Sequence, residues 1–97
     1  MWTFPDEVGG RTRAEVVAEV KRRLEECAGL VDGMGAFRVV VPQDGLEASF
    51  DLLLDSEFES VEALQAYAAH PTHRAVGELI AATRTARHAF DYDPDAC

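Results

Sequence analysis

The sequence has no long apolar run. No stretch approaches the roughly 18 consecutive apolar residues that a membrane-spanning helix needs. Residues 1–30 also lack the basic start and apolar core of a secretory signal peptide. We therefore expect a cytoplasmic protein that does not act in a membrane. Its 97 residues are enough for a single domain, residues 1–97, near the lower size limit for folding without disulfides or metals.

Basic residues are scarce. Nine lysines and arginines stand against 18 acidic residues, which gives a formal net charge of −9. An acidic surface repels phosphate backbones. The one basic cluster, residues 21–23, is flanked by Glu19, Glu25 and Glu26 on the same predicted helix, so we interpret it as a solvated helix face. Nucleic acid is therefore not an expected partner.

Cysteine is also rare, and metal-binding patterns are missing. Cys27 and Cys97 match no metal-ligand spacing. We expect Cys27 to lie in a core, Cys97 to fray at the end of the chain, and neither to form a disulfide or act as a thiol catalyst. His70 and His73 have helical spacing, but Pro71 interrupts them and no third ligand is evident. The sequence therefore predicts no metal and no cofactor.

The first part of the chain predicts a strand followed by a helix. Residues 1–4 alternate like the end of a strand, so the chain is expected to begin in mid-strand, and Pro5 closes it. Thr12 and Glu15 have the spacing of a capping box, which marks a helix start. The helix is predicted to end near Gly29. Its predicted apolar face comprises Val17, Val20, Leu24, Cys27 or Ala28, and Val31.

Two neighbouring strands are predicted next. Residues 36–41 are rich in β-branched side chains and end at Pro42, and residues 48–58 alternate between apolar and polar. Asp44-Gly45 between them predicts a tight turn. The side of the second strand expected to face the helices is Ala48, Phe50, Leu52 and Leu54.

A pair of short helices and a last strand complete the pattern. Ser60 is a predicted N-cap, and Pro71 ends the first of the two helices. Thr72 is predicted to cap the second, while His70 is expected to bond free carbonyls at the helix end. Residues 84–92 are the predicted last strand. The expected buried edges are Val61, Leu64 and Ala68 on the first helix and His73, Val76 and Ile80 on the second.

This order of elements predicts an α+β, ferredoxin-like fold. Such a fold has one four-stranded antiparallel sheet with helices on one face. The other face would expose Val39 or Val40 together with Leu53, which is too apolar for a stable monomer. We therefore predict a homodimer in which the two open faces pair across a two-fold axis.

Residues 67–73 read Tyr-Ala-Ala-His-Pro-Thr-His. This string resembles the Tyr-x-x-His-Pro-x-His signature of the stress-responsive A/B barrel (Dabb) family of dimeric α+β barrels, and in particular its polyketide (olivetolic acid-type) cyclases. The resemblance implies a homodimer and an aldol-type ring closure of a linear polyketide. It makes His73 the candidate base and Tyr67 the residue that positions the substrate oxygen. Those cyclases also carry a histidine on the third strand, where this sequence has Leu52.

The residue types fit that chemistry. An imidazole can move a proton near neutral pH, and a phenol can hydrogen-bond an oxygen on which charge develops. We hypothesise an apolar pocket between helices and sheet that takes a small hydrophobic or polyketide-like ligand. Its predicted lining is Val20, Leu24, Leu52 and Leu54, with Tyr67 and His73 at the polar end.

Two alternatives stay open. In a non-catalytic, stress-associated structural dimer, side chains would fill the same space, and the string would lock two helices together. A cofactor-free monooxygenase on a related scaffold is the third reading. A cavity of at least ~300 Å³ that touches both Tyr67 and His73 would favour the pocket over the filled core.

Overall fold

The computed structural model describes residues 1–96, so the expectation for Cys97 lies outside the described residues. This part of the chain forms three helices and six short strands. The helices are α1 (Arg13–Glu25), α2 (Val61–Ala69) and α3 (Pro71–Thr83); the strands are β1 (Trp2–Thr3), β2 (Glu7–Val8), β3 (Arg11–Thr12), β4 (Met34–Val40), β5 (Leu53–Phe58) and β6 (Ala86–Arg87).

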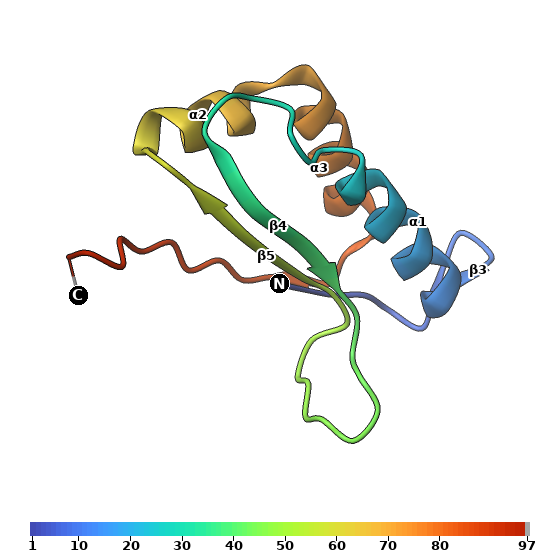
Figure 1. Ribbon diagram of the computed structural model, residues 1–97. Coiled ribbons are helices and arrows are strands. Elements are labelled where there is room, and N and C mark those ends of the chain that lie inside the picture. The colour runs from blue at the N-terminus through green and yellow to red at the C-terminus, as the bar shows by residue number, and fades with distance from the viewer. Residues whose placement is uncertain (97) are drawn as a thin grey trace.

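The main strands lie side by side in the order β4, β5, β1, β6. β4 and β5 are antiparallel, with Val39 opposite Leu54. Trp2 of β1 bridges Leu52, the residue before β5, and the Trp2 N–H donates to the Leu52 carbonyl at 3.0 Å. β6 pairs with the other edge of β1. This strand order is ferredoxin-like, and Figure 1 shows the three helices together on one side of β4 and β5.

The start of α1 follows the prediction closely. Thr12 Oγ1 accepts a hydrogen bond from the Glu15 N–H at 3.2 Å, and the Glu15 carboxylate accepts one from the Thr12 N–H at 3.2 Å. The capping box is therefore confirmed. The apolar face of this helix was predicted to begin at Val17, which is wrong by one residue, because Val16 is buried while Val17 is only half-buried. The buried side continues through Val20, Leu24 and Cys27.

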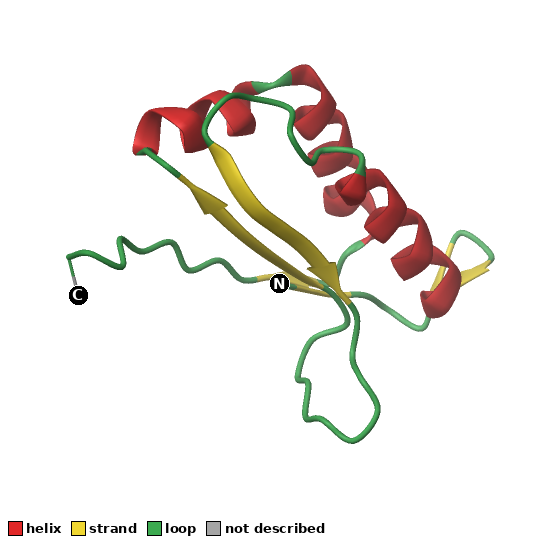
Figure 2. Cartoon of the chain, in the orientation of Figure 1, coloured by secondary structure: helices red, strands yellow, loops and turns green. Residues whose placement is uncertain are grey.

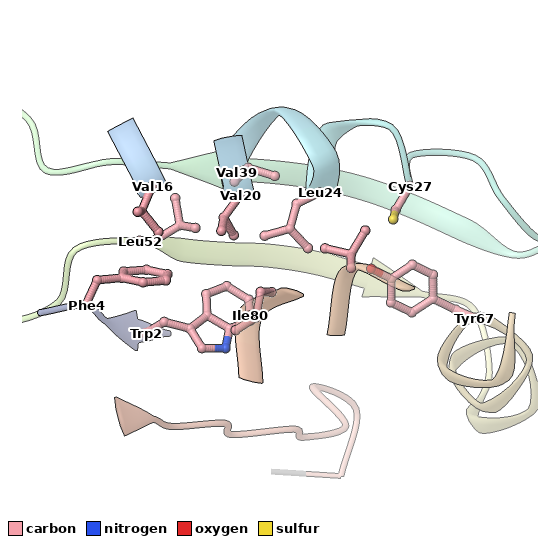
Figure 3. Close-up of a cluster of buried hydrophobic side chains, with 11 residues drawn as sticks. Trp2, Phe4, Val16, Val20, Leu24, Cys27, Val39, Leu52, Tyr67 and Ile80 are labelled. Carbon is pink, nitrogen blue, oxygen red and sulfur yellow. The ribbon is translucent and has the colours of Figure 1, made fainter. Parts of the chain in front are cut away.

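The core lies between the helices and one face of the sheet. Figure 3 shows its side chains meeting from α1, β1, the start of β5 and the α2–α3 pair. Removing these apolar surfaces from water is the main favourable term in folding, at ~25 cal/mol per Å². The buried cluster is Trp2, Phe4, Val16, Val20, Leu24, Cys27, Val39, Leu52, Tyr67, Val76 and Ile80.

The buried edge of α2 also differs from the prediction. Ala63 and Tyr67 are buried, whereas Val61 is 65% exposed. Small apolar residues surround most of this helix, so periodicity alone did not identify the side that faces the core. Ser60 caps α2 as predicted, since its hydroxyl accepts a hydrogen bond from the Ala63 N–H at 3.1 Å.

Two strands are shorter than predicted. β5 begins at Leu53, and residues 41–52 form a long loop, drawn in green in Figure 2. The predicted turn at Asp44-Gly45 lies within this loop, where the Leu46 N–H donates to the Gln43 carbonyl at 3.1 Å. β6 covers only Ala86–Arg87 of the predicted 84–92. The His88 N–H still donates to the Met1 carbonyl at 2.9 Å. Residues after His88 lie past the end of β1, so no described strand completes a ladder with them.

The helix-free face of the sheet is partly apolar. Val40 lies opposite Leu53, and Leu53 is 38% exposed. Val39 is only 9% exposed and faces the core, so Val40 is the valine on the open face. Val40, Leu53 and the loop after β4 line a surface hollow of about 350 Å³.

Candidate functional site

The candidate site is built around the break between α2 and α3. Pro71 has no backbone N–H and is the first residue of α3. Its ring restricts His70 to an extended conformation, with φ −65° and ψ 134°, so the helix cannot run through. Tyr67 is on the last turn of α2 and His73 on the first turn of α3. The break therefore places the two candidate side chains on adjoining helix ends.

His70 caps α3. Its Nδ1 accepts a hydrogen bond from the Thr72 N–H at 3.1 Å, which satisfies one of the free amides at the helix start. The prediction that Thr72 caps this helix is wrong, because Thr72 lies inside it. The expectation that His70 bonds free carbonyls is also wrong, since its ring nitrogen acts as an acceptor.

His73 replaces a backbone hydrogen bond that is lost at the helix break. In an uninterrupted helix the Ala68 carbonyl would accept from the Thr72 N–H, but that N–H donates to His70. The Nδ1 atom of His73 lies 3.1 Å from the Ala68 oxygen instead. A carbonyl can only accept, so Nδ1 carries the proton and Nε2 of the neutral ring keeps its lone pair. The Ala68 carbonyl thus orients the imidazole, a role that sequence reasoning did not assign to any group.

The rings of Tyr67 and His73 pack against each other. Their centroids are 4.5 Å apart with an interplanar angle of 53°. Phe58 of β5 lies 5.2 Å from Tyr67 and Phe37 of β4 lies 5.9 Å from it, so Tyr67 is the centre of a small aromatic cluster. The contact joins α2 to α3 and both to the sheet.

The Tyr67 hydroxyl points into the core. Tyr67 is 4% exposed, and its oxygen has no hydrogen-bond partner of ordinary geometry among residues 1–96. Figure 3 shows that oxygen directed toward the side of the core where Cys27 lies. Burial, then the charge of a Cys27 thiolate and a weak contact with that thiol, raise the pKa of Tyr67 far above its usual range. The phenol therefore stays neutral and can only serve as a hydrogen-bonding group.

Cys27 is the neighbour that sequence reasoning missed. It is fully buried, and its thiol donates a weak hydrogen bond to the Arg23 carbonyl at 3.7 Å. Burial raises the pKa of Cys27, so the group is a thiol at neutral pH. No spacing in the sequence links it to Tyr67, since Cys27 lies in the turn after α1, Tyr67 lies on α2, and the two meet only through tertiary packing.

The four predicted ligand-binding residues are part of the core. Leu54 is half-buried and packs against the buried cluster that includes Tyr67. The exposed fractions of the other three are 1–2%: Val20, Leu24 and Leu52. Residues 1–96 form a surface hollow of about 350 Å³ on the helix-free face and another of about 280 Å³ lined by residues 33–35 and 57–59. Neither is lined by Tyr67 or His73.

Two further features of residues 1–96 bear on partners. No group of three or more His, Cys, Asp or Glu side chains is placed there to hold a metal ion. Every helix in this part of the chain falls short of the length and apolarity that a membrane crossing requires.

These features define the class of protein first, an α+β protein of ferredoxin-like fold whose helices cover one face of the sheet. Within that class, the chain belongs to the stress responsive A/B barrel domain (Dabb) family, whose model matches residues 1–94. The predicted family and fold class are thereby confirmed. No curated protein matches the chain.

Two solved structures are similar in fold. A dimeric protein of unknown function and ferredoxin-like fold from Bacteroides fragilis matches with a TM-score of 0.77 and 25% identity, over 95% of this chain and 88% of that chain. A dimeric ferredoxin-like protein of unknown function from Thermobifida fusca matches with a TM-score of 0.73 and 17% identity, over 89% of this chain and 77% of that chain.

The role of His70 can be tested by substitution. His70→Ala removes the acceptor of the Thr72 N–H and should lower the free energy of unfolding by about 0.5–2 kcal/mol, as loss of an N-cap does. His70→Asn restores a side-chain acceptor and should recover most of that loss. Urea denaturation of both variants measures the difference. An equal loss in both would show that His70 acts through packing and not as a cap.

The buried phenol predicts a stability change at alkaline pH. Above about pH 10, unfolded Tyr67 releases its proton while the folded protein keeps it, so the unfolded state binds fewer protons and stability falls as pH rises. Tyr67→Phe should weaken this decline between about pH 9 and pH 11 and should not lower stability at pH 7, because the buried hydroxyl has no hydrogen-bond partner to lose. Parallel declines in the wild type and in Tyr67→Phe would contradict the burial of this hydroxyl.

Proposed function

We propose that the protein works as a homodimer whose two sheets pack together through their helix-free faces. The observation that carries this proposal is the apolar part of that face, where Val40 and Leu53 lie opposite each other. Leu46 of the neighbouring loop is 67% exposed beside them, in the lining of the same hollow. Both similar solved structures are of proteins described as dimeric, which supports the same assembly here.

A two-fold axis makes this arrangement self-complementary. Each copy presents the same apolar surface to the other, and the paired contacts close without leaving a surface for a third copy. At ~25 cal/mol per Å², several hundred Å² of apolar area would contribute many kcal/mol before the cost of association is subtracted. The same face also carries Arg38 and Asp55, which form a salt bridge at 3.5 Å. A polar pair at the rim of an apolar patch is usual in interfaces.

Within each copy, we infer that the layer between helices and sheet is a filled core. The predicted lining residues are packed there with Tyr67, and both histidines of the string direct a ring nitrogen to the backbone at the helix break. These contacts favour a non-catalytic role, in which the string holds α2 and α3 together and the dimer as a whole is the working unit.

A second candidate is proton transfer to a small hydrophobic or polyketide-like ligand. Its support is the lone pair that Nε2 of His73 keeps, together with a Tyr67 hydroxyl that lacks a partner. The imidazole would take a proton from carbon in an aldol-type ring closure, and the phenol would donate to the oxygen that gains charge. For a ligand to reach that hydroxyl, the side chains around Cys27 must move aside. The monooxygenase reading gains no support from a feature of residues 1–96.

The homodimer is tested by a charge on the helix-free face. Leu53→Asp puts a carboxylate into the proposed interface and should shift the protein from dimer to monomer at micromolar concentration. Val61→Asp, at a valine that is 65% exposed on α2, is the control and should remain dimeric. Sedimentation velocity measures the mass. A wild-type protein that sediments as a monomer at these concentrations would refute the proposal.

The two candidate roles are separated by a ring-closure assay. We expect the wild-type protein to convert a linear tetraketide-type substrate no faster than buffer, as followed by chromatography and mass spectrometry. His73→Gln, which keeps an N–H for the Ala68 carbonyl but provides no base, should behave in the same way. Acceleration of about tenfold or more by wild type that His73→Gln abolishes, with the helical circular dichroism retained, would overturn the non-catalytic reading and establish the second candidate.

A further inference from the structure

The chain leaves the sheet after β6 as an extended tail with two exposed aromatic side chains. His88 anchors the root of this tail, since its N–H donates to the Met1 carbonyl at 2.9 Å and its ring stacks edge-on against Phe50 at 5.2 Å. Beyond it, Phe90 is 82% exposed and Tyr92 is 70% exposed. Their rings pair with each other at 6.1 Å. Two adjoining exposed aromatic rings are a surface that a binding partner normally covers.

The tail has the side-chain pattern of a strand. In extended chain, successive side chains point to opposite sides, so Phe90 and Tyr92 lie on one side and Asp91 and Asp93 on the other. The carboxylates can therefore stay in water while the rings are buried. We call residues 89–93 the arm.

The helix-free face offers a hollow of matching chemistry. Its volume is about 350 Å³, and most of its lining is apolar. A cavity of about 150 Å³ is enough to hold one benzene ring, so the space suits two rings. The apolar lining includes Val40, Val41, Pro42, Leu46, Phe50 and Leu53.

The arm runs away from the hollow of its own copy. β5 and β6 are both antiparallel to β1, so they run in the same direction, and the arm continues that direction past Met1. Figures 1 and 2 show the tail extending to one side while the loop of residues 41–52 hangs at the other end of the sheet. At ~3.3 Å per residue, Tyr92 lies about 13 Å beyond His88 along this path. To reach its own hollow the arm would have to reverse and give up the contacts at His88.

We propose that the arm of each copy inserts Phe90 and Tyr92 into the hollow on the helix-free face of the second copy. The proposal rests on the homodimer proposed above, because the hollow is part of the face that the dimer buries. The exchange is reciprocal under two-fold symmetry, so both arms and both hollows are satisfied. Phe50 connects the two features, since it lines the hollow and also packs on the root of the arm. Buried aromatic anchors of this kind commonly dominate the affinity of an interface.

Mixed-copy disulfide trapping tests the contact directly. One batch carries Leu46→Cys in the hollow and the other Phe90→Cys in the arm, both with Cys97→Ser so that Cys27, which is buried, is the remaining native cysteine. After mixing and mild oxidation, a covalent species joining positions 46 and 90 of different copies should form in high yield. Val61→Cys replaces Leu46→Cys in the control mixture and should give only background. A protein carrying both Leu46→Cys and Phe90→Cys that links within one copy would overturn the exchange.

Sedimentation equilibrium separates this proposal from the homodimer itself. Replacing Phe90 and Tyr92 together by alanine should raise the dimer dissociation constant by at least about tenfold. A wild-type monomer would defeat the homodimer and the arm together. A wild-type dimer whose dissociation constant is unchanged by the two alanines, with only background trapping between positions 46 and 90, would defeat the arm proposal and leave the homodimer in place.

Discussion

The three helices all pack on one face of the sheet. Apolar side chains on that face are therefore buried, whereas those on the opposite face stay exposed. The side chains of the buried cluster that Figure 3 labels lie between the helices and that face. The opposite face has no helix, yet it carries Val40 of β4 and Leu53 of β5. A small domain has little apolar area to spare, so an uncovered apolar face is costly in water. This uncovered apolar face is the physical basis of the proposed homodimer.

The α2–α3 break is understood by following its backbone hydrogen bonds. Pro71 removes one donor, and the turn leaves the Thr72 N–H and the Ala68 carbonyl without their helical partners. One imidazole accepts from the first group and the other donates to the second. The Tyr-x-x-His-Pro-x-His string therefore has a structural reason for each of its polar positions after the tyrosine. The same bonds fix opposite tautomers on the two neutral rings, and only His73 keeps its Nε2 free as a base.

Features set by local chemistry were predictable from the sequence. The capping box at Thr12 and the cap at Ser60 depend on residues within one helical turn, and both are confirmed. Where two adjacent residues fit the apolar pattern equally well, the sequence did not show which of them is buried. Val16 and Val17 are both apolar, and only packing selects Val16 for the core. His70 was missed as a cap because Thr72 is the usual residue type for that role, whereas α3 starts at Pro71, two positions earlier than a cap at Thr72 would allow.

Tertiary features had no signal in the sequence. The predicted strand over 84–92 has the right alternation, but a strand needs a neighbour, and β1 reaches only as far as the pair between Met1 and His88. Likewise, Cys27 and Tyr67 are 40 positions apart, and only tertiary packing brings the thiol, in the turn after α1, to the hydroxyl on α2. Composition and periodicity describe the faces of single elements. They do not say which atoms from two elements meet.

The position of the Tyr67 hydroxyl decides how much chemistry the site can do without rearrangement. A phenol at this depth with no partner costs about 1–3 kcal/mol, which the packing of its ring against His73, Phe58 and Phe37 offsets. A substrate that accepted a hydrogen bond from it would recover that cost but would have to displace the thiol and side chains of α1. Dimerisation through the helix-free face requires no such opening, because the apolar surface it buries is already exposed. The fold thus presents an exposed apolar face for association, whereas catalysis would need the turn after α1 to move away from α2, a movement that the packed core resists.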